Sequence, residues 1–131
     1  MSQLGMCNSN ALAVYAGFGF YPSWDINLCS DGAGGVGGNT IYTVPAGKTL
    51  KVFGGCLSAI NGGGAPYYTK IECYDGSSWI TLIRLSVDAG GSENDNRTLW
   101  EPIEVPEGYT VRVNDENAAI TSYGVINGYL I

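Results

Sequence analysis

The chain has 131 residues, of which 20 are glycine and only 14% are charged. Its 12 acidic residues outnumber its 6 basic ones and give a formal net charge of −6, which argues against nucleic acid and anionic membranes as partners, because both are bound by clustered Lys and Arg. The sequence contains no histidine, which excludes nucleophile pairs and metal sites that depend on this residue.

Residues 1–40 differ in composition from the rest of the chain. The run from Ala11 to Phe20 is apolar, and the first basic residue is Lys48. A secretory signal starts with a positive region and a membrane span needs about 20 apolar residues, so the run fits neither. Residues 31–39 read DGAGGVGGN, which is typical of a flexible linker. We therefore predict an N-terminal arm with a Gly-rich linker at 1–40 and a folded domain at 41–131, made in the cytoplasm.

Residues 41–131 alternate β-type runs with turn signals about every 8–12 residues, a spacing typical of a sandwich or barrel. No stretch keeps a convincing helical period without Gly or Pro, so we predict almost no helix. The expected strands lie at residues 49–52, 68–74, 79–87, 97–103, 109–113 and 120–131.

The run from Trp79 to Val87 has the strongest strand pattern. Strict alternation puts Trp79, Thr81 and Ile83 on one face, while Ile80 and Leu82 make part of the other face apolar as well. A strand that is apolar on both faces is covered on both. We expect the second cover to come from the N-terminal segment or from a neighbouring subunit.

Two turn–strand units carry the same pattern, one from Thr43 to Val52 and one from Glu104 to Val113. In each, we expect Pro at the second position and Gly at the fourth position of a type I turn, followed by a short alternating strand. The repeat suggests two related halves of one antiparallel sandwich, with chance similarity of short units as the alternative.

The four cysteines are Cys7, Cys29, Cys56 and Cys73, and they contain no C-x-x-C pair, which argues against a zinc site. We favour four free thiols that pack as small hydrophobic groups in a protein made in a reducing cytosol. A disulfide is the alternative, because an even number of cysteines permits two bridges, and the spacing does not say which cysteines would pair. We predict no metal and no cofactor.

Two short motifs have ordinary structural interpretations. Residues 32–37 match G-x-G-x-x-G, but a dinucleotide site needs a helix after this motif, and here a strand pattern follows. Residues 88–96 are acidic but lack the spacing of a calcium loop, so we interpret them as a solvated hairpin loop. No pair of carboxylates stands out for glycoside hydrolysis. The sequence thus predicts no catalytic residue and a chain that is not an enzyme.

Aromatic residues near the expected hairpin ends are the candidate binding residues. Rings with a polar handle suit protein interfaces and sugar stacking, and ordinary packing in the core and at its rim is the alternative. The candidates are Tyr67, Tyr68, Tyr74, Trp79 and Trp100.

Residues 41–131 resemble the small jelly-roll domains of tailed-bacteriophage virions. The resemblance rests on the paired V-P-x-G-x-T turns, the hairpin at residues 74–79, the lead-in at 100–103 and the closing strand at 128–131. It implies an all-β fold, an antiparallel β-sandwich of jelly-roll type with an N-terminal arm. Such domains occur in capsid decoration (cement) proteins, head fibres and receptor-binding fibre tips, commonly as trimers.

The resemblance also implies a role for the arm and for the whole chain. In such proteins the N-terminal segment often anchors the domain to the particle, and the matching apolar residues here are Leu12, Val14, Tyr15, Phe18 and Phe20. We hypothesise a non-enzymatic virion protein, a capsid decoration protein that binds the major capsid protein or another virion protein and forms a homotrimer. The alternative is a receptor-binding or carbohydrate-binding module of a phage fibre that recognises a host glycan.

Overall fold

The computed structural model describes residues 26–131 and places nine β-strands in this range. The strands are β1 (Ile26–Ala33), β2 (Gly35–Val36), β3 (Asn39–Thr43), β4 (Leu50–Asn61), β5 (Tyr67–Tyr74), β6 (Trp79–Val87), β7 (Ser92–Val105), β8 (Thr110–Asp115) and β9 (Ile120–Leu130). The same range contains no helix, and accordingly none that would be long and apolar enough to cross a membrane.

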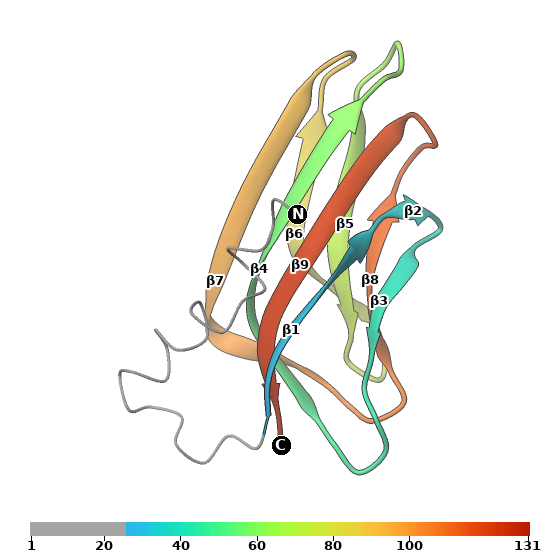
Figure 1. Cartoon of the computed structure of the whole chain (residues 1–131). Helices are drawn as coiled ribbons and strands as arrows, with labels where there is room; N and C mark the ends of the chain where they lie inside the picture. The colour runs from blue at the N-terminus through green and yellow to red at the C-terminus, as the bar shows by residue number, and fades with distance from the viewer. Residues whose placement is uncertain (1–25) are drawn as a thin grey trace.

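The strands form two sheets that pack face to face as a sandwich (Figure 1). Sheet A has the strand order β1-β9-β4-β7, and sheet B has the order β2-β8-β5-β6 with β3 also paired to β8. All pairs are antiparallel except the short pair between β2 and β8. Without β2, each sheet holds four strands, and the crossing connections give the two Greek keys of a jelly roll. The predicted all-β antiparallel sandwich of jelly-roll type is confirmed.

The core lies between the two sheets and is built from alternate residues of nearly every strand. Because side chains alternate along a strand, each sheet turns one apolar face toward the other. The largest fully buried side chains are Leu50, Leu57, Ile71, Leu82, Ile83, Ile126, Val44, Val52, Val87, Val105, Val111 and Val113.

A β-bulge in β6 overturns the expectation that this strand is apolar on both faces. The pairing of β6 with β5 skips Leu82, and Leu82 and Ile83 are both buried in the core. A bulge inserts one extra residue and shifts the phase of alternation. The apolar residues on both sides of the bulge therefore turn inward, whereas Thr81 is exposed. The sequence pattern needs no second cover from an arm or a subunit.

Residues 31–39, whose composition is typical of a linker, contribute to both sheets. Residues 31–33 end β1 beside β9, and β2 pairs with β8. At Gly34, a Cβ atom would lie 2.7 Å from Val113 Cγ1 and 2.8 Å from Asp115 Oδ1, so this glycine permits close packing rather than flexibility. The described sandwich therefore includes strands ahead of residue 41. Residues 1–25 lie outside the described range, and the arm stays a prediction.

The edge strand β7 is longer than its sequence suggests. It begins at Ser92, so the acidic segment 88–96 is a loop only at residues 88–91, where the Gly91 N–H donates to the Asp88 carbonyl at 2.8 Å. Its first seven residues are all exposed. The polar sequence resembles a loop because a strand at a sheet edge can carry polar side chains on both faces.

The two Pro–Gly turns lie side by side at one end of the sandwich. The Lys48 N–H donates to the Pro45 carbonyl at 3.2 Å, which makes Pro45 the first residue of the turn and Gly47, with φ of 76°, the third. The turn that begins at Pro106 repeats this geometry, and the Val44 carbonyl accepts a hydrogen bond from it at 2.9 Å. The type I prediction is therefore wrong: Pro and Gly each lie one position earlier than expected, and a positive φ at the third position is typical of a type II turn.

A buried polar bridge joins the sheets at the opposite end. Asp115 Oδ1 on β8 accepts hydrogen bonds of 2.6 Å from Thr69 Oγ1 on β5 and from Ser122 Oγ on β9. All three side chains are buried. Since a buried acceptor without donors is costly, this bridge ties the register of sheet A to that of sheet B.

Replacing Gly34 by Ala tests whether the glycine-rich segment is packed. We expect Gly34→Ala to lower the free energy of unfolding by about 1–3 kcal/mol, because the new methyl group would collide with the Asp115 bridge. Urea denaturation curves measure this change. Gly64→Ala is the matched control, since nothing lies within 4 Å of its Cβ position. An equal loss in both variants would contradict the packed interpretation.

Candidate interaction surfaces

The outer face of sheet B is occupied by an ionic network around Glu72 of β5. The Glu72 side chain is only 4% exposed. Its Oε1 accepts hydrogen bonds from Arg112 Nε at 3.0 Å and Asn114 Nδ2 at 3.1 Å, and its Oε2 lies 2.9 Å from Lys70 Nζ. Burial alone would raise the pKa of Glu72, but the hydrogen bonds from Lys70, Asn114 and Arg112 outweigh burial and lower it.

Aromatic rings flank this network at the end of sheet B near the β5–β6 turn. The Tyr74 ring centroid lies 5.0 Å from that of Trp79 and 5.0 Å from that of Tyr109. Arg112 Cζ lies 3.7 Å from the Trp79 centroid, so the guanidinium covers one face of the indole. This face of Trp79 is therefore not open for a sugar ring.

Tyr68 lies further along the same face of β5 and is also paired with cations. Arg84 Cζ lies 4.3 Å and Lys70 Nζ 5.5 Å from the centre of its ring. The adjacent Tyr67 points the other way and packs against the core. The structure therefore brings Tyr74 and Trp79 together and separates both from Tyr67.

Tyr109 belongs to the aromatic cluster but is absent from the sequence-based candidates. Tyr74 and Trp79 face each other across the Asp75–Gly76 turn, where Ser78 accepts a backbone hydrogen bond from Asp75 at 3.0 Å. That hairpin is visible in the sequence. Tyr109 joins through the pairing of β8 with β5, which no local pattern reveals.

Trp100 lies on the other sheet, in a wide irregularity of the edge strand β7. Thr98 pairs with Gly54 and Ile103 pairs with Val52, so residues 99–102 bulge out of the ladder. Leu99 and Ile103 pack against the core on either side of the bulge. The Trp100 residue itself is fully exposed. These two half-buried neighbours hold the segment while the indole projects into solvent.

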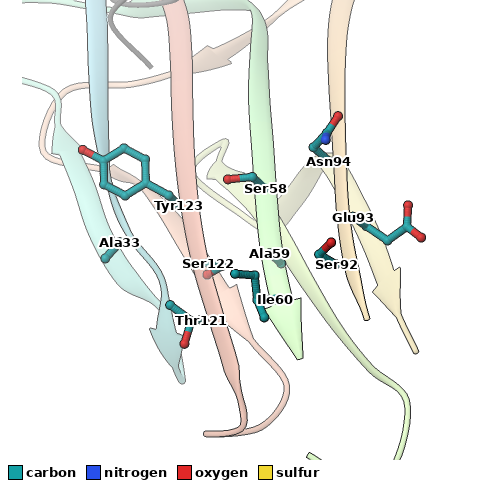
Figure 2. Close-up of a pocket in the computed structure, with 10 residues that line it drawn as sticks. All are labelled: Ala33, Ser58, Ala59, Ile60, Ser92, Glu93, Asn94, Thr121, Ser122 and Tyr123. Atoms are coloured by element: carbon teal, nitrogen blue, oxygen red, sulfur yellow. The ribbon is translucent and has the colours of Figure 1, made fainter. Parts of the chain in front are cut away.

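A shallow groove of about 400 Å³ lies on the outer face of sheet A, at the end near the Asp115 bridge. Figure 2 shows the Tyr123 ring on one side of this groove and the side chains of β7 on the other. The Tyr123 hydroxyl donates to Asp31 Oδ1 at 2.9 Å, which orients the ring. The remaining wall is mostly small or polar and comes from Ala33, Ser58, Ala59, Ile60, Ser92, Glu93, Asn94, Thr121 and Ser122.

The cysteines differ from the favoured set of four free thiols. Cys29 on β1 is disulfide-bonded, so that preference is wrong at this position. Cys56 and Cys73 are free. Burial raises the pKa of both thiols, that of Cys73 to about 12, with added repulsion from Asp95 at Cys56 and from Glu72 at Cys73. Both are therefore poor nucleophiles. Within residues 26–131 no group of three metal-binding side chains comes together.

Comparison with known proteins finds no matching protein-family model and no matching curated protein. Solved structures with some similarity include PirA, at 11% identity and a TM-score of 0.40, covering 82% of this chain and 98% of that one. A protein of the disulfide-linked pili of Bacillus endospore appendages is 10% identical with a TM-score of 0.35, covering 79% and 85%. A CBM4 protein is 17% identical with a TM-score of 0.34, covering 81% and 63%. Similarity this low carries no argument about what the chain binds.

Glu72→Gln tests the ionic network on sheet B. We expect the free energy of unfolding at pH 7 to fall by about 1–3 kcal/mol, because Lys70 and Arg112 lose a buried charged partner. The Glu72 pKa is lowered in the folded chain from its usual 4.5, so the carboxylate stabilises the fold above that pH and loses this effect as the pH falls through the lowered pKa. Urea titrations across this pH range should show the two proteins converging in acid.

Glu104→Gln is the matched control for this prediction. Glu104 lies 2.7 Å from Lys51 Nζ, but its side chain is 62% exposed. Exposed pairs contribute about 0–1 kcal/mol. A loss at Glu104 as large as that at Glu72, or a difference at Glu72 that persists in acid, would contradict the account of the network.

Proposed function

We propose that the chain is a non-enzymatic structural accessory protein of a virion, of the capsid-decorating kind, and that it acts through protein–protein contacts. The observation that carries the proposal is Trp100, which is fully exposed on the bulge of β7. Tryptophan is the residue type most enriched among energetically dominant interface residues. An indole that projects from a sheet edge, on a segment anchored by Leu99 and Ile103, suits attachment to another protein.

The surface of Trp100 is large enough to contribute substantially to attachment. A tryptophan buries about 150–250 Å², which corresponds to about 4–6 kcal/mol at ~25 cal/mol per Å², before the costs of association. Because Leu99 and Ile103 already hold the bulge in place, little further ordering is needed when a partner binds. Repetition of this contact on a symmetric lattice adds avidity.

The proposed partners are other copies of this chain, as a homotrimer, and the major capsid protein or another virion protein. The formal net charge of −6 disfavours nucleic acid and anionic lipid as the surface to which it attaches. The free edge of β7 carries Glu93, Asp95 and Arg97, and charges on an edge strand oppose unspecific strand addition. Attachment through a projecting side chain is compatible with such an edge.

Carbohydrate binding is the second candidate function, and the groove on sheet A is the observation that favours it. The groove combines one aromatic ring, Tyr123, with the hydroxyl and amide groups of Ser58, Ser92, Asn94 and Thr121. A ring with several hydrogen-bonding groups around it matches the alternating apolar and polar surface of a saccharide. The aromatic cluster on sheet B is less suited, since Arg112 covers a face of Trp79.

Trp100→Ala tests the decoration proposal. We expect the wild-type protein to form a trimer in solution and the variant to dissociate at least about tenfold more readily, because the main apolar contact is lost. Light scattering across a concentration series measures the mass. Co-sedimentation with capsid shells from the same source as the chain should fall by a similar factor.

Val36→Ala provides the control for Trp100→Ala, because Val36 is also an exposed apolar residue, on the edge of sheet B. It should leave mass and co-sedimentation unchanged. A wild-type protein that stays monomeric and ignores capsid shells, or a Trp100→Ala variant that attaches normally, would overturn the proposal.

Ser58→Ala combined with Asn94→Ala tests the carbohydrate candidate. If the groove binds sugar, the affinity for the best oligosaccharide on a glycan array should fall at least about tenfold, because two polar contacts are removed. Calorimetry with that oligosaccharide measures the change. Thr81→Ala, on the exposed outer face of sheet B, is the control. An array without hits would rule this candidate out.

A further inference from the structure

The outer face of sheet A carries apolar side chains that do not belong to the core between the sheets. Phe53 is 6% exposed and Val125 is 2% exposed, yet neither is part of the core cluster. Along β9, Val125 alternates with Gly124 and Ile126. Ile126 lies in the core, and a Cβ at Gly124 would lie 2.6 Å from Val113 Cγ2 of sheet B. Val125 therefore points away from the core.

Neighbouring residues extend this surface into a patch. The centroids of the Phe53 and Tyr129 rings lie 6.3 Å apart. Asn127, between Val125 and Tyr129 on the same face of β9, is also buried and directs Nδ2 toward Cys29 Sγ at 3.9 Å. We call Cys29, Phe53, Val125, Asn127 and Tyr129 the outer patch.

The outer patch requires a cover. Antiparallel sheets leave one face to solvent when that face is polar, whereas Phe53 and Val125 in this part of the face are apolar and buried. Between residues 26 and 131, the other strands that are not in sheet A form sheet B on the opposite side (Figure 1). The cover must therefore come from the remaining part of this chain or from another molecule.

The cysteines identify the occupant. Cys29 in the patch is disulfide-bonded, whereas Cys56 and Cys73 are free thiols. The chain has four cysteines, so Cys7 is the one left to pair with Cys29 within the chain. The segment that carries Cys7 joins β1 at Ile26, only three residues before Cys29 and at the edge of the same sheet.

The composition of this segment fits the patch. Residues 1–25 contain no Lys or Arg and include the apolar side chains of Leu12, Val14, Phe18 and Phe20. An apolar segment without basic residues can bury its side chains on an apolar sheet face without leaving unpaired cations. The stretch between Cys7 and Ile26 is also long enough to return across the face of the sheet.

We propose that residues 1–25 fold back over the outer patch and are fastened there by a disulfide between Cys7 and Cys29. In the bond-forming step, the two thiols lose two protons and two electrons. A low-molecular-weight disulfide such as oxidised glutathione accepts these electrons and becomes two thiols. This inference goes beyond the proposed function and does not depend on it. A segment docked in this way completes the sandwich, and Trp100 remains as the projecting contact.

Peptide mapping of the full-length protein without reduction tests the covalent part. Chymotrypsin cuts after aromatic residues such as Tyr15 and Phe20, which lie between the two cysteines, so a bridge keeps the Cys7 and Cys29 peptides together. We expect one linked pair of peptides that reduction separates. Alkylation of Cys7 and Cys29 without prior reduction would overturn the proposal. A dimer on a non-reducing gel that disappears on reduction would overturn it in favour of a second copy as the occupant.

Native proteolysis of the full chain tests the cover itself. We expect chymotrypsin to cut after Phe18 and Phe20 at least tenfold more slowly in the native protein than in the urea-denatured protein. Val125→Asp should remove this protection, whereas the matched control Thr121→Asp, at an exposed position of the same face of β9, should keep it.

A milder substitution at Val125 keeps the test valid if the aspartate variant unfolds. If Val125→Asp does not give a folded circular dichroism spectrum, Val125→Ser supplies the same comparison with a several-fold effect. Equal cleavage rates in the native and denatured wild-type protein, or equal rates in the Val125 and Thr121 variants, would overturn the proposal. None of these measurements depends on Trp100, so failure of the cover and failure of the decoration proposal are distinguishable.

Discussion

The carboxylate of Asp115 joins the two sheets at the end of the sandwich opposite the Pro–Gly turns. It accepts short hydrogen bonds from Thr69 of sheet B and from Ser122 of sheet A, and all three side chains are buried. Sliding one sheet along the other would leave a buried oxygen without its donors, which costs about 1–3 kcal/mol or more. Apolar burial is non-directional, whereas these hydrogen bonds require one relative position of the three side chains. The placement of the groove and Trp100 on sheet A relative to the aromatic cluster on sheet B follows from that register.

The outer faces of the two sheets carry different kinds of side chain. On sheet B, Arg84 and Arg112 lie over aromatic rings, and Lys70 and Arg112 pair with Glu72. The charged and aromatic side chains of this face therefore have partners within the sheet. On sheet A, Phe53 and Val125 form an apolar surface outside the core. Because we assign that apolar patch to residues 1–25, the surfaces left for other molecules are the groove on sheet A and Trp100 on its edge strand. The attachment that we propose therefore concerns one side of the molecule.

The fold class was accessible from the sequence because alternation and turn residues are local signals. The Asp75–Gly76 turn and the strand that ends at Leu130 follow directly from such signals. The bulge at Leu82 was not accessible, since an extra residue in a strand is recognised only from its partner strand. Strict alternation therefore predicted a second apolar face that does not exist.

The candidate surfaces were less predictable for a related reason. Trp100 could be selected as an aromatic residue near an expected hairpin end, but its projection depends on the skipped pairing between β7 and β4. Tyr123 and its groove arise where four strands distant in the sequence meet, β1, β4, β7 and β9, and no local pattern marks them. Because the bulge that carries Trp100 lies outside the ladder of backbone hydrogen bonds, the indole can be exchanged for another side chain with little effect on the scaffold. Binding preference in this molecule can therefore change separately from folding, because a substitution in this short projection leaves the architecture intact.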